Sequence, residues 1–282
     1  MIELISPYGR DFPMLHVRTK ACTALVSLYG AQVLDWAPQG AEPVLWLSPQ
    51  CVFQRGRPIR GGIPICWPWF GKAPLRPDRP SHGVARTSLW TLERAAETED
   101  GVARMELSLQ PASSLLPSAH LVIGAGRRLR MRLETSRREW NEPFSAAFHC
   151  YFQVGDREQC PIDGLADVPF TEYAAGGSLH DESPLFPRGP IDRVYHPTEN
   201  DVELRDPLLR RCLRIRRRGS RSLVVWNPGS AVAAEMDDVG PGNERRFLCV
   251  ETAVAPCEHA FLPQNGGSCA FECEISVCAP GA

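Results

Sequence analysis

The stretch RLRMRLETS, residues 128–136, alternates charged and apolar side chains over its first six positions. Leu129, Met131 and Leu133 occupy every second place, with arginines between them. Successive side chains of a strand point to opposite faces of a sheet, so this period of two predicts a strand with one buried and one solvated face. The same alternation recurs in ARMELSLQ, residues 103–110, and in AFECEISV, residues 270–277. Strands of this kind are typical of antiparallel sheets.

Turn-forming residues divide the chain into short elements. It holds 26 prolines and 23 glycines in 282 residues, which favours many turns over long helices. We expect at most a short helix near Leu115. Antiparallel sandwiches of this length commonly form one domain. The sequence therefore predicts an all-β, mostly antiparallel fold in a single domain spanning residues 1–282.

Charge and hydropathy argue against several classes of partner. The formal net charge of -2 gives no reason to expect nucleic acid or a membrane surface. No apolar run reaches the ~18 residues of a membrane helix, and the first residues lack the pattern of a signal peptide. The 11 cysteines form no CxxC pair and no zinc pattern. We expect reduced thiols and a cytoplasmic location.

The stretch IRGGIPICWPWFG, residues 59–71, combines rigid, flexible and charged residues, and SHGVART, residues 81–87, follows it. Gly61 and Gly62 let the backbone turn or approach a ligand closely. Trp67 and Trp69 offer flat faces for a sugar ring, and Arg60 and Arg86 are two of the arginines that could bind hydroxyl or phosphate oxygens. The alternative is that the tryptophans belong to the core and the arginines to the surface.

A histidine stands inside the apolar and aromatic run SAAFHCYFQVGD. His149 is therefore at least partly enclosed, and one interpretation is a core histidine with its hydrogen bonds satisfied. The functional interpretation is a general acid, because imidazole exchanges protons near neutral pH.

A glutamate follows the apolar strand Phe247 to Val250 in RRFLCVETAVAP. Glu251 is either solvated at the exit of that strand or held in the interior for a purpose, since buried charges are rare without partners. Burial would raise its pKa toward a range that is useful for a base.

Six segments in order, PIRGGIPICWPWFG, HGVART, FHCYFQVGD, IDRVY, VVWNPG and LCVET, resemble the signature segments of the aldose 1-epimerase superfamily. They are most similar to its hexose-6-phosphate mutarotase branch, the glucose-6-phosphate 1-epimerase family. The resemblance covers nearly the whole chain. It implies a galactose mutarotase-like β-supersandwich with neither metal nor organic cofactor.

The resemblance also implies roles for particular residues. His149 resembles the catalytic histidine of the family and Glu251 its catalytic base. The positions that resemble ligand-binding residues are Arg60, His82, Arg86, Asp192, Trp226 and Asn227, with the two arginines facing a phosphate. One departure is Trp69, where relatives commonly carry glutamine, and this puts the hexose preference in doubt.

The implied reaction interconverts the α and β anomers of a hexose 6-phosphate by opening and reclosing the ring. Glu251 would take the proton of the C1 hydroxyl while a protonated His149 gives one to the ring oxygen. The expected partner is a small sugar phosphate, and the expected state is a monomer. The alternatives are a non-catalytic carbohydrate-binding or sugar-phosphate-sensing module, a structural β protein, or a glycoside hydrolase, which ordinarily needs two carboxylates.

Overall fold

The alternating stretch at residues 128–136 forms β9 (Arg128–Ser136), a central strand of an eight-stranded sheet. Its three apolar side chains are buried, and the arginines between them are exposed or half-buried. The period of two thus places one face of the strand in the core, as predicted. The computed structural model describes residues 1–74, 76–110, 116–136, 140, 142–177, 182–258, 260 and 267–278.

The named strands form three sheets, and all pairs between named strands of the described ranges are antiparallel. The first sheet has the order β1 (Ile2–Ile5), β2 (Met14–Arg18), β3 (Cys22–Ser27) and β4 (Gln32–Pro38). The second has the order β13 (Phe170–Glu172), β14 (Ile191–Tyr195), β17 (Ser222–Asn227), β18 (Phe247–Val254), β10 (Ala146–Phe148) and β5 (Ile65–Cys66), with β11 (Tyr151–Gln153) also paired to β18. The third has the order β12 (Ile162–Asp163), β15 (Val202–Asp206), β16 (Arg211–Arg218), β19 (Ser268–Cys278), β9, β8 (Ser118–Ala125), β7 (Ala103–Leu109) and β6 (Thr91–Glu97).

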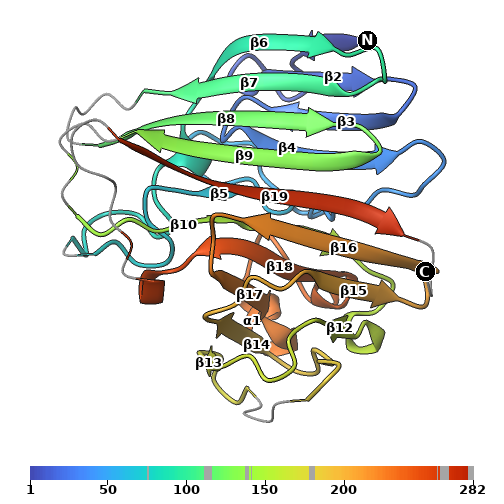
Figure 1. Cartoon of the computed structure of the whole chain (residues 1–282), viewed down its shortest axis with the longest axis vertical. Coiled ribbons are helices and arrows are strands. Elements are labelled where there is room, and N and C mark those ends of the chain that lie inside the picture. Colours follow the sequence, from blue (N-terminus) through green and yellow to red (C-terminus); the bar gives the residue numbers. More distant parts are fainter. Residues whose placement is uncertain are drawn as a thin grey trace.

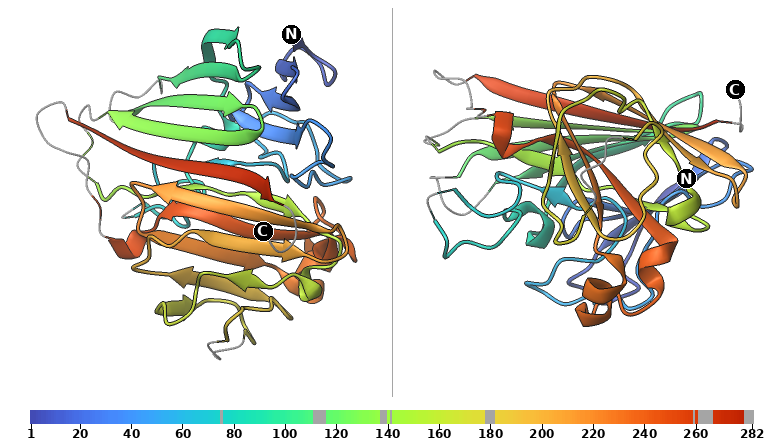
Figure 2. Two further views of the ribbon diagram at one scale, coloured as in Figure 1. Left: turned by 45° about the vertical axis from the view of Figure 1, so that its right-hand side comes forward. Right: turned by 90° about the horizontal axis from the view of Figure 1, so that it is seen from below.

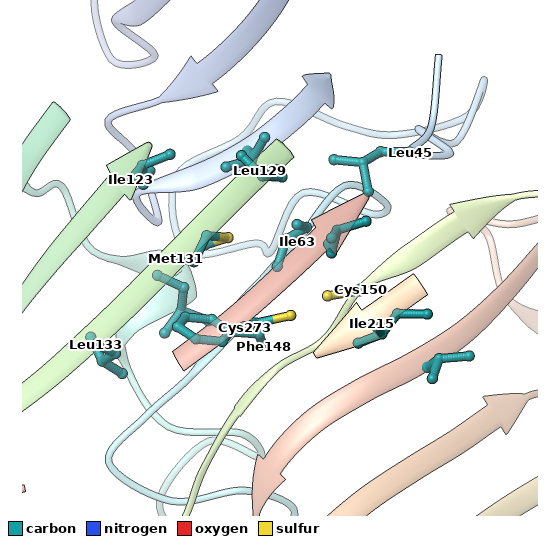
Figure 3. Packing of buried hydrophobic residues seen from close by; sticks show 14 of the residues in the cluster. Leu45, Ile63, Ile123, Leu129, Met131, Leu133, Phe148, Cys150, Ile215 and Cys273 are labelled. Carbon is teal, nitrogen blue, oxygen red and sulfur yellow. The ribbon is translucent and has the colours of Figure 1, made fainter. Parts of the chain in front are cut away.

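The eight-stranded sheet packs against the other two sheets, and the main core lies between the layers (Figures 1 and 2). Trp36 of β4 reaches across and donates a hydrogen bond to the carbonyl of Gly126, beyond β8. The rings of Phe148 and Phe271 meet between β10 and β19, with centroids 4.6 Å apart. Figure 3 shows Phe148 and Cys150 among side chains of β9 and β19. The second sheet is thereby held with one face against the core and the other turned away from it.

Helices are short in the described residues, and the all-β prediction is confirmed. They are α1 (Gly229–Glu235) and the 3-10 turns η1 (Ala85–Thr87), η2 (Arg157–Gln159), η3 (Asn243–Arg246) and η4 (Pro256–Glu258). None of these helices is long and apolar enough to cross a membrane. The sequence did not predict α1. The short helix expected near Leu115, in ASSLLPSA at residues 112–119, lies outside the described residues as far as 115; residues 116–119 are not helical and lead into β8. The assignment of residues 1–282 to a single domain stays a prediction.

Candidate active site

The direction of Glu251 follows from the alternation along β18. Leu248 and Val250 belong to the core between the layers, whereas Cys249 packs in a separate cluster. Because side chains alternate between faces, Glu251 shares the face of Cys249, away from the eight-stranded sheet. It lies inside the strand and is 1% exposed. The interpretation of Glu251 as a solvated residue at a strand exit is therefore wrong.

A break in the neighbouring strand places His149 opposite this carboxylate. β10 ends at Phe148, which pairs with Thr252, and β11 begins at Tyr151, which pairs with Cys249. His149 falls in the gap, and its Nε2 lies 3.4 Å from Oε1 of Glu251. Phe148 and Cys150 on either side belong to the core cluster. The strand break therefore joins the two predicted catalytic side chains, which are far apart in the sequence.

Aromatic rings surround the imidazole. The Tyr151 ring stacks on His149 with centroids 4.8 Å apart and planes 10° apart. Trp226 and His82 approach nearly edge-on, at 5.6 Å and 6.0 Å. His149 is 8% exposed, and its Nδ1 has no hydrogen-bond partner among the described residues. The interpretation as a core histidine with both nitrogens satisfied is therefore wrong.

Burial favours the uncharged form of both members of this pair. It raises the pKa of Glu251 well above the ordinary value; the neighbouring charge of Asp192 adds to this and that of Arg86 opposes it. Burial also lowers the pKa of His149, and His82, Arg60 and Arg86 lower it further. Burial therefore opposes the imidazolium–carboxylate form of the pair that the proposed reaction needs.

Asp192 and Trp226 lie on the same face of the second sheet as Glu251. Asp192 of β14 pairs directly with Trp226 of β17, and Val224, two residues before Trp226, pairs with Glu251. Burial raises the pKa of Asp192, and the charge of Glu172 adds to this rise. Glu172 also accepts a hydrogen bond from the backbone N–H of Asp192 at 2.8 Å. Asp192 thus faces the catalytic pair from two strands away.

The two arginines approach the pair from different segments. Arg60 donates from Nε to Asp238 at 3.0 Å and from Nη1 to Tyr151 Oη at 2.7 Å. Arg86, in η1, donates to the carbonyl of Ser81 at 3.0 Å. The charges of both arginines lower the pKa of His149, after burial and His82. The predicted cations therefore lie near the catalytic pair.

His82 stands beside the pair in a strained backbone conformation. Its φ is +62°, which is uncommon for a residue other than glycine. Its Nδ1 accepts a hydrogen bond from the N–H of Gly71 at 3.3 Å. Burial, followed by the charges of Arg86 and Arg60, lowers the pKa of His82 to about 3. His82 is therefore neutral at ordinary pH and able to exchange hydrogen bonds with an uncharged sugar hydroxyl.

The glycines and tryptophans of residues 59–71 have structural roles, which the sequence alone did not distinguish from ligand binding. A Cβ on Gly61 would lie 2.4 Å from the carbonyl oxygen of Trp46, and one on Gly62 would lie 2.3 Å from that of Val33. The close approach is thus to the backbone of this chain, not to a ligand. Trp67 is buried in the core and donates to Thr135. The idea that its face stacks on a sugar ring is therefore wrong.

Trp69, the noted departure from relatives, is also buried. Its indole N–H donates to the carbonyl of Pro80 at 2.8 Å, and its ring stacks near Trp140 with the Arg79 guanidinium over it. The indole N–H is therefore engaged by backbone and is not offered to a sugar hydroxyl.

Asn227 does not offer its side chain to a ligand. Its amide donates to the carbonyls of Glu244 and Phe247, both at 2.9 Å, and its oxygen accepts from the N–H of Gly229 at 3.0 Å. The side chain is fully buried. The prediction that Asn227 lines the site is corrected: it holds the connection from β17 to α1.

Sequence reasoning missed Tyr151, Asp238 and Glu172. Tyr151 stands two residues after His149 in a quoted segment, so its neighbourhood was visible. Asp238 follows α1 at a separation of 178 residues from Arg60, and no local pattern signals that contact. Glu172 lies on the edge strand β13 and reaches Arg193 and the backbone of Asp192. Only the pairing of β13 with β14 reveals it.

Replacing Glu251 by glutamine is expected to stabilise the protein at neutral pH. Folding raises the pKa of this carboxyl above 4.5, so the free energy of unfolding of the wild-type protein falls as pH rises above that value. The loss is ~1.4 kcal/mol for each unit by which folding raises the pKa. A glutamine at this position does not titrate, so it adds no such pH dependence. Urea unfolding at pH 7 and pH 4 should show a gain for Glu251→Gln that shrinks at pH 4; a gain of equal size at both would contradict the burial effect.

The chain is similar to known proteins over most of its length. The family model described as aldose 1-epimerase matches residues 13–265. A protein of Escherichia coli K12 named "Putative glucose-6-phosphate 1-epimerase" is 36% identical over 264 residues, which cover 90% of this chain and 89% of that protein. A crystal structure titled "putative mutarotase" from Salmonella typhimurium superposes with a TM-score of 0.85 at 27% identity, covering 99% of this chain and 97% of that one.

A galactose 1-epimerase from Lactobacillus acidophilus shares the fold, with a TM-score of 0.72 at 15% identity over 99% of each chain. The family match covers most of the sequence. The chain therefore belongs to the aldose 1-epimerase family of sugar isomerases.

Proposed function

We propose that this protein is a hexose-6-phosphate mutarotase that interconverts the α and β anomers of glucose 6-phosphate. The observation that carries the proposal is the 3.4 Å contact between His149 Nε2 and Glu251 Oε1, with Arg60 and Arg86 beside it. The hydroxyl oxygen and the ring oxygen are both bonded to C1. An acid and a base must therefore lie within a few ångströms of each other to act on both, as these two do.

Ring opening needs one proton removed and one supplied. Glu251, as carboxylate, takes the proton of the C1 hydroxyl, and His149, as imidazolium, gives its Nε2 proton to the ring oxygen. The C1–O5 bond breaks as the C1=O bond forms. Rotation about C1–C2 turns the other face of the aldehyde toward the hydroxyl that contains O5. The two residues reverse their roles when the ring closes. The proton count of the pair is one throughout.

Burial favours the uncharged form of both groups. Moving a proton from Glu251 to His149 Nε2 creates the imidazolium and the carboxylate together, without proton exchange with water. The reactive form of the pair therefore requires only this internal transfer.

The phosphate preference is supported by two considerations. Arg86 donates one hydrogen bond to a backbone carbonyl, and a guanidinium has five N–H donors. Arginine suits phosphate because its planar fork matches two oxygens. The names of the curated relatives point to the same substrate. A free hexose lacks the phosphate dianion that Arg60 and Arg86 would attract.

Two-dimensional exchange NMR distinguishes the substrates. Catalytic amounts of protein should speed anomer exchange of glucose 6-phosphate, and of galactose 6-phosphate if the hexose is not discriminated, far more than that of free glucose. Arg86→Ala should raise the KM for the phosphate by about 10–100-fold, the usual effect of losing a charged hydrogen bond. Arg10→Ala, which removes an exposed arginine, is the matched control.

Three outcomes would contradict parts of the proposal. No acceleration with any sugar would favour a non-catalytic carbohydrate-binding module. Acceleration of free sugars alone would contradict the phosphate preference. An unchanged KM in Arg86→Ala would remove this arginine from phosphate binding.

A further inference from the structure

A chain of contacts joins the segment after α1 to the imidazole of His149. Asp238 Oδ2 accepts a hydrogen bond from Arg60 Nε at 3.0 Å, and Arg60 Nη1 donates to Tyr151 Oη at 2.7 Å. The Tyr151 ring then stacks on the His149 ring. The side chains of Arg60 and Asp238 are only 19% and 17% exposed. Salt and water therefore weaken this ion pair less than a surface pair.

The orientation of His149 depends on this stack. An imidazole that acts through one nitrogen is commonly oriented by a hydrogen bond at the other. Here Nε2 faces Glu251, and Nδ1 has no hydrogen-bond partner among the described residues. Trp226 and His82 meet the ring nearly edge-on, while Tyr151 lies parallel to it within 10°. The plane of the imidazole is thus set by the plane of Tyr151.

Tyr151 is held in turn at both ends. Its ring is buried against Trp46 and Phe247, with centroids at 5.8 Å and 5.2 Å. Its hydroxyl accepts the Arg60 hydrogen bond. An arginine side chain that is free to move samples many rotamers, and the contact of Arg60 Nε with Asp238 restricts that freedom here. Asp238 therefore determines where the guanidinium can hold the Tyr151 hydroxyl.

We propose that Asp238 and Tyr151 are positioning residues for the reaction. Asp238 fixes the Arg60 guanidinium, Arg60 fixes the Tyr151 hydroxyl, and the Tyr151 ring holds the imidazole of His149 in the plane that aims Nε2 at the ring oxygen of the sugar. This inference rests on the acid role of His149 in the proposed function. It places a residue outside the six signature segments in control of the catalytic acid.

Kinetics of variants test the first link. Asp238→Ala should lower kcat by about tenfold while KM stays within about twofold, since orientation of the acid matters in the transition state more than in binding. Asp238→Asn should restore most of kcat, because the amide oxygen still accepts from Arg60 Nε. Asp237→Ala, which removes the exposed neighbouring carboxylate, is the matched control and should behave as wild type. A change in KM alone, or equal effects of Asp237→Ala and Asp238→Ala, would overturn the proposal.

The second link is tested at Tyr151. Tyr151→Phe keeps the ring and loses the hydroxyl, whereas Tyr151→Leu loses both. We expect a moderate loss of kcat in the first and a larger one in the second, with melting temperatures measured for both. Equal kcat in the leucine variant and the wild type would overturn the role of the stack.

A spectroscopic readout needs no substrate. Long-range ¹H–¹⁵N spectra report the imidazole nitrogens, and His149→Ala identifies the His149 signals. Asp238→Ala should shift or broaden those signals although it does not touch the ring, and Asp237→Ala should leave them unchanged. Unchanged signals in Asp238→Ala would overturn the proposal. If the wild-type protein accelerates the anomer exchange of no sugar, the proposed function fails. These spectra still decide whether Asp238 controls the orientation of the His149 ring.

Discussion

Glu251→Gln is expected to reduce the catalysed anomer exchange by about 10²–10⁴-fold, the range of one general acid–base contribution. Glutamine preserves the size of the side chain and can still reach His149, but it cannot take the proton of the C1 hydroxyl. His149→Ala should cause a loss in the same range, because the ring oxygen then lacks its acid. Exchange NMR on glucose 6-phosphate at saturating concentration measures both.

The control for this prediction is Glu244→Gln. Glu244 is also a buried glutamate, at 4% exposed, but it lies in η3 and is not part of the catalytic pair. Its replacement should leave kcat close to wild type. Because Glu251→Gln is expected to stabilise the fold at neutral pH, its loss of activity should not come with a lower melting temperature. Activity retained within a few-fold in Glu251→Gln would show that another group is the base.

Gly83→Ala is expected to destabilise the protein by about 3 kcal/mol or more. Gly83 has a φ of +76°, which costs a non-glycine residue about 1–2 kcal/mol. A Cβ there would lie 1.9 Å from the carbonyl oxygen of Trp67, and relieving such overpacking typically costs a further 1–3 kcal/mol. The Cβ would meet the backbone of Trp67, so rotation of a side chain cannot relieve the contact. Urea denaturation with a constant m-value measures the loss.

Gly71→Ala separates the two contributions. Gly71 has nearly the same φ, +74°, but a Cβ there meets no atom within 4 Å. Its replacement should therefore cost only the conformational part, about 1–2 kcal/mol. Equal losses in the two variants would show that the close approach of Gly83 to Trp67 contributes nothing. Gly83 adjoins His82 and precedes Arg86, so its loss should also weaken sugar-phosphate binding.

Local pattern was sufficient to predict three of the strands and to select His149 and Glu251 as candidate catalytic residues. Period-two alternation identified β7, β9 and β19, since one face of each meets the core and the other meets water. His149 and Glu251 were recognisable because a titratable residue inside an apolar strand is unusual and because their segments resemble those of a family. The comparisons confirm that family. The roles of the individual site residues stay predictions for the variants above.

Local pattern failed where a residue could serve either a ligand or the chain itself. Gly61 and Gly62 are compatible with a ligand loop, yet both admit neighbouring backbone. Trp67 has the character of a sugar platform, yet it fills the core between the sheets. Asn227 stands beside Trp226, yet its amide is used by three backbone groups. Whether each of these residues contacts a ligand or packs within the protein depends on which distant segment lies beside it. A short stretch of sequence does not contain that information.

The order of apolar and polar residues by itself determined that this chain forms antiparallel sheets. Apolar residues at every second position share one face only when the segment is a strand, and strands with one buried and one solvated face are typical of antiparallel sheets. The segment resemblance pointed to His149 and Glu251 as the candidate acid and base. Only the tertiary structure decided that the gap between β10 and β11 lies opposite the middle of β18, which brings two residues far apart in the sequence into contact. Only it decided that burial shifts the pKa of each toward the uncharged form and that Asp238 reaches Arg60. Burial and long-range pairing are properties of the packed layers, and they arise when the sheets meet.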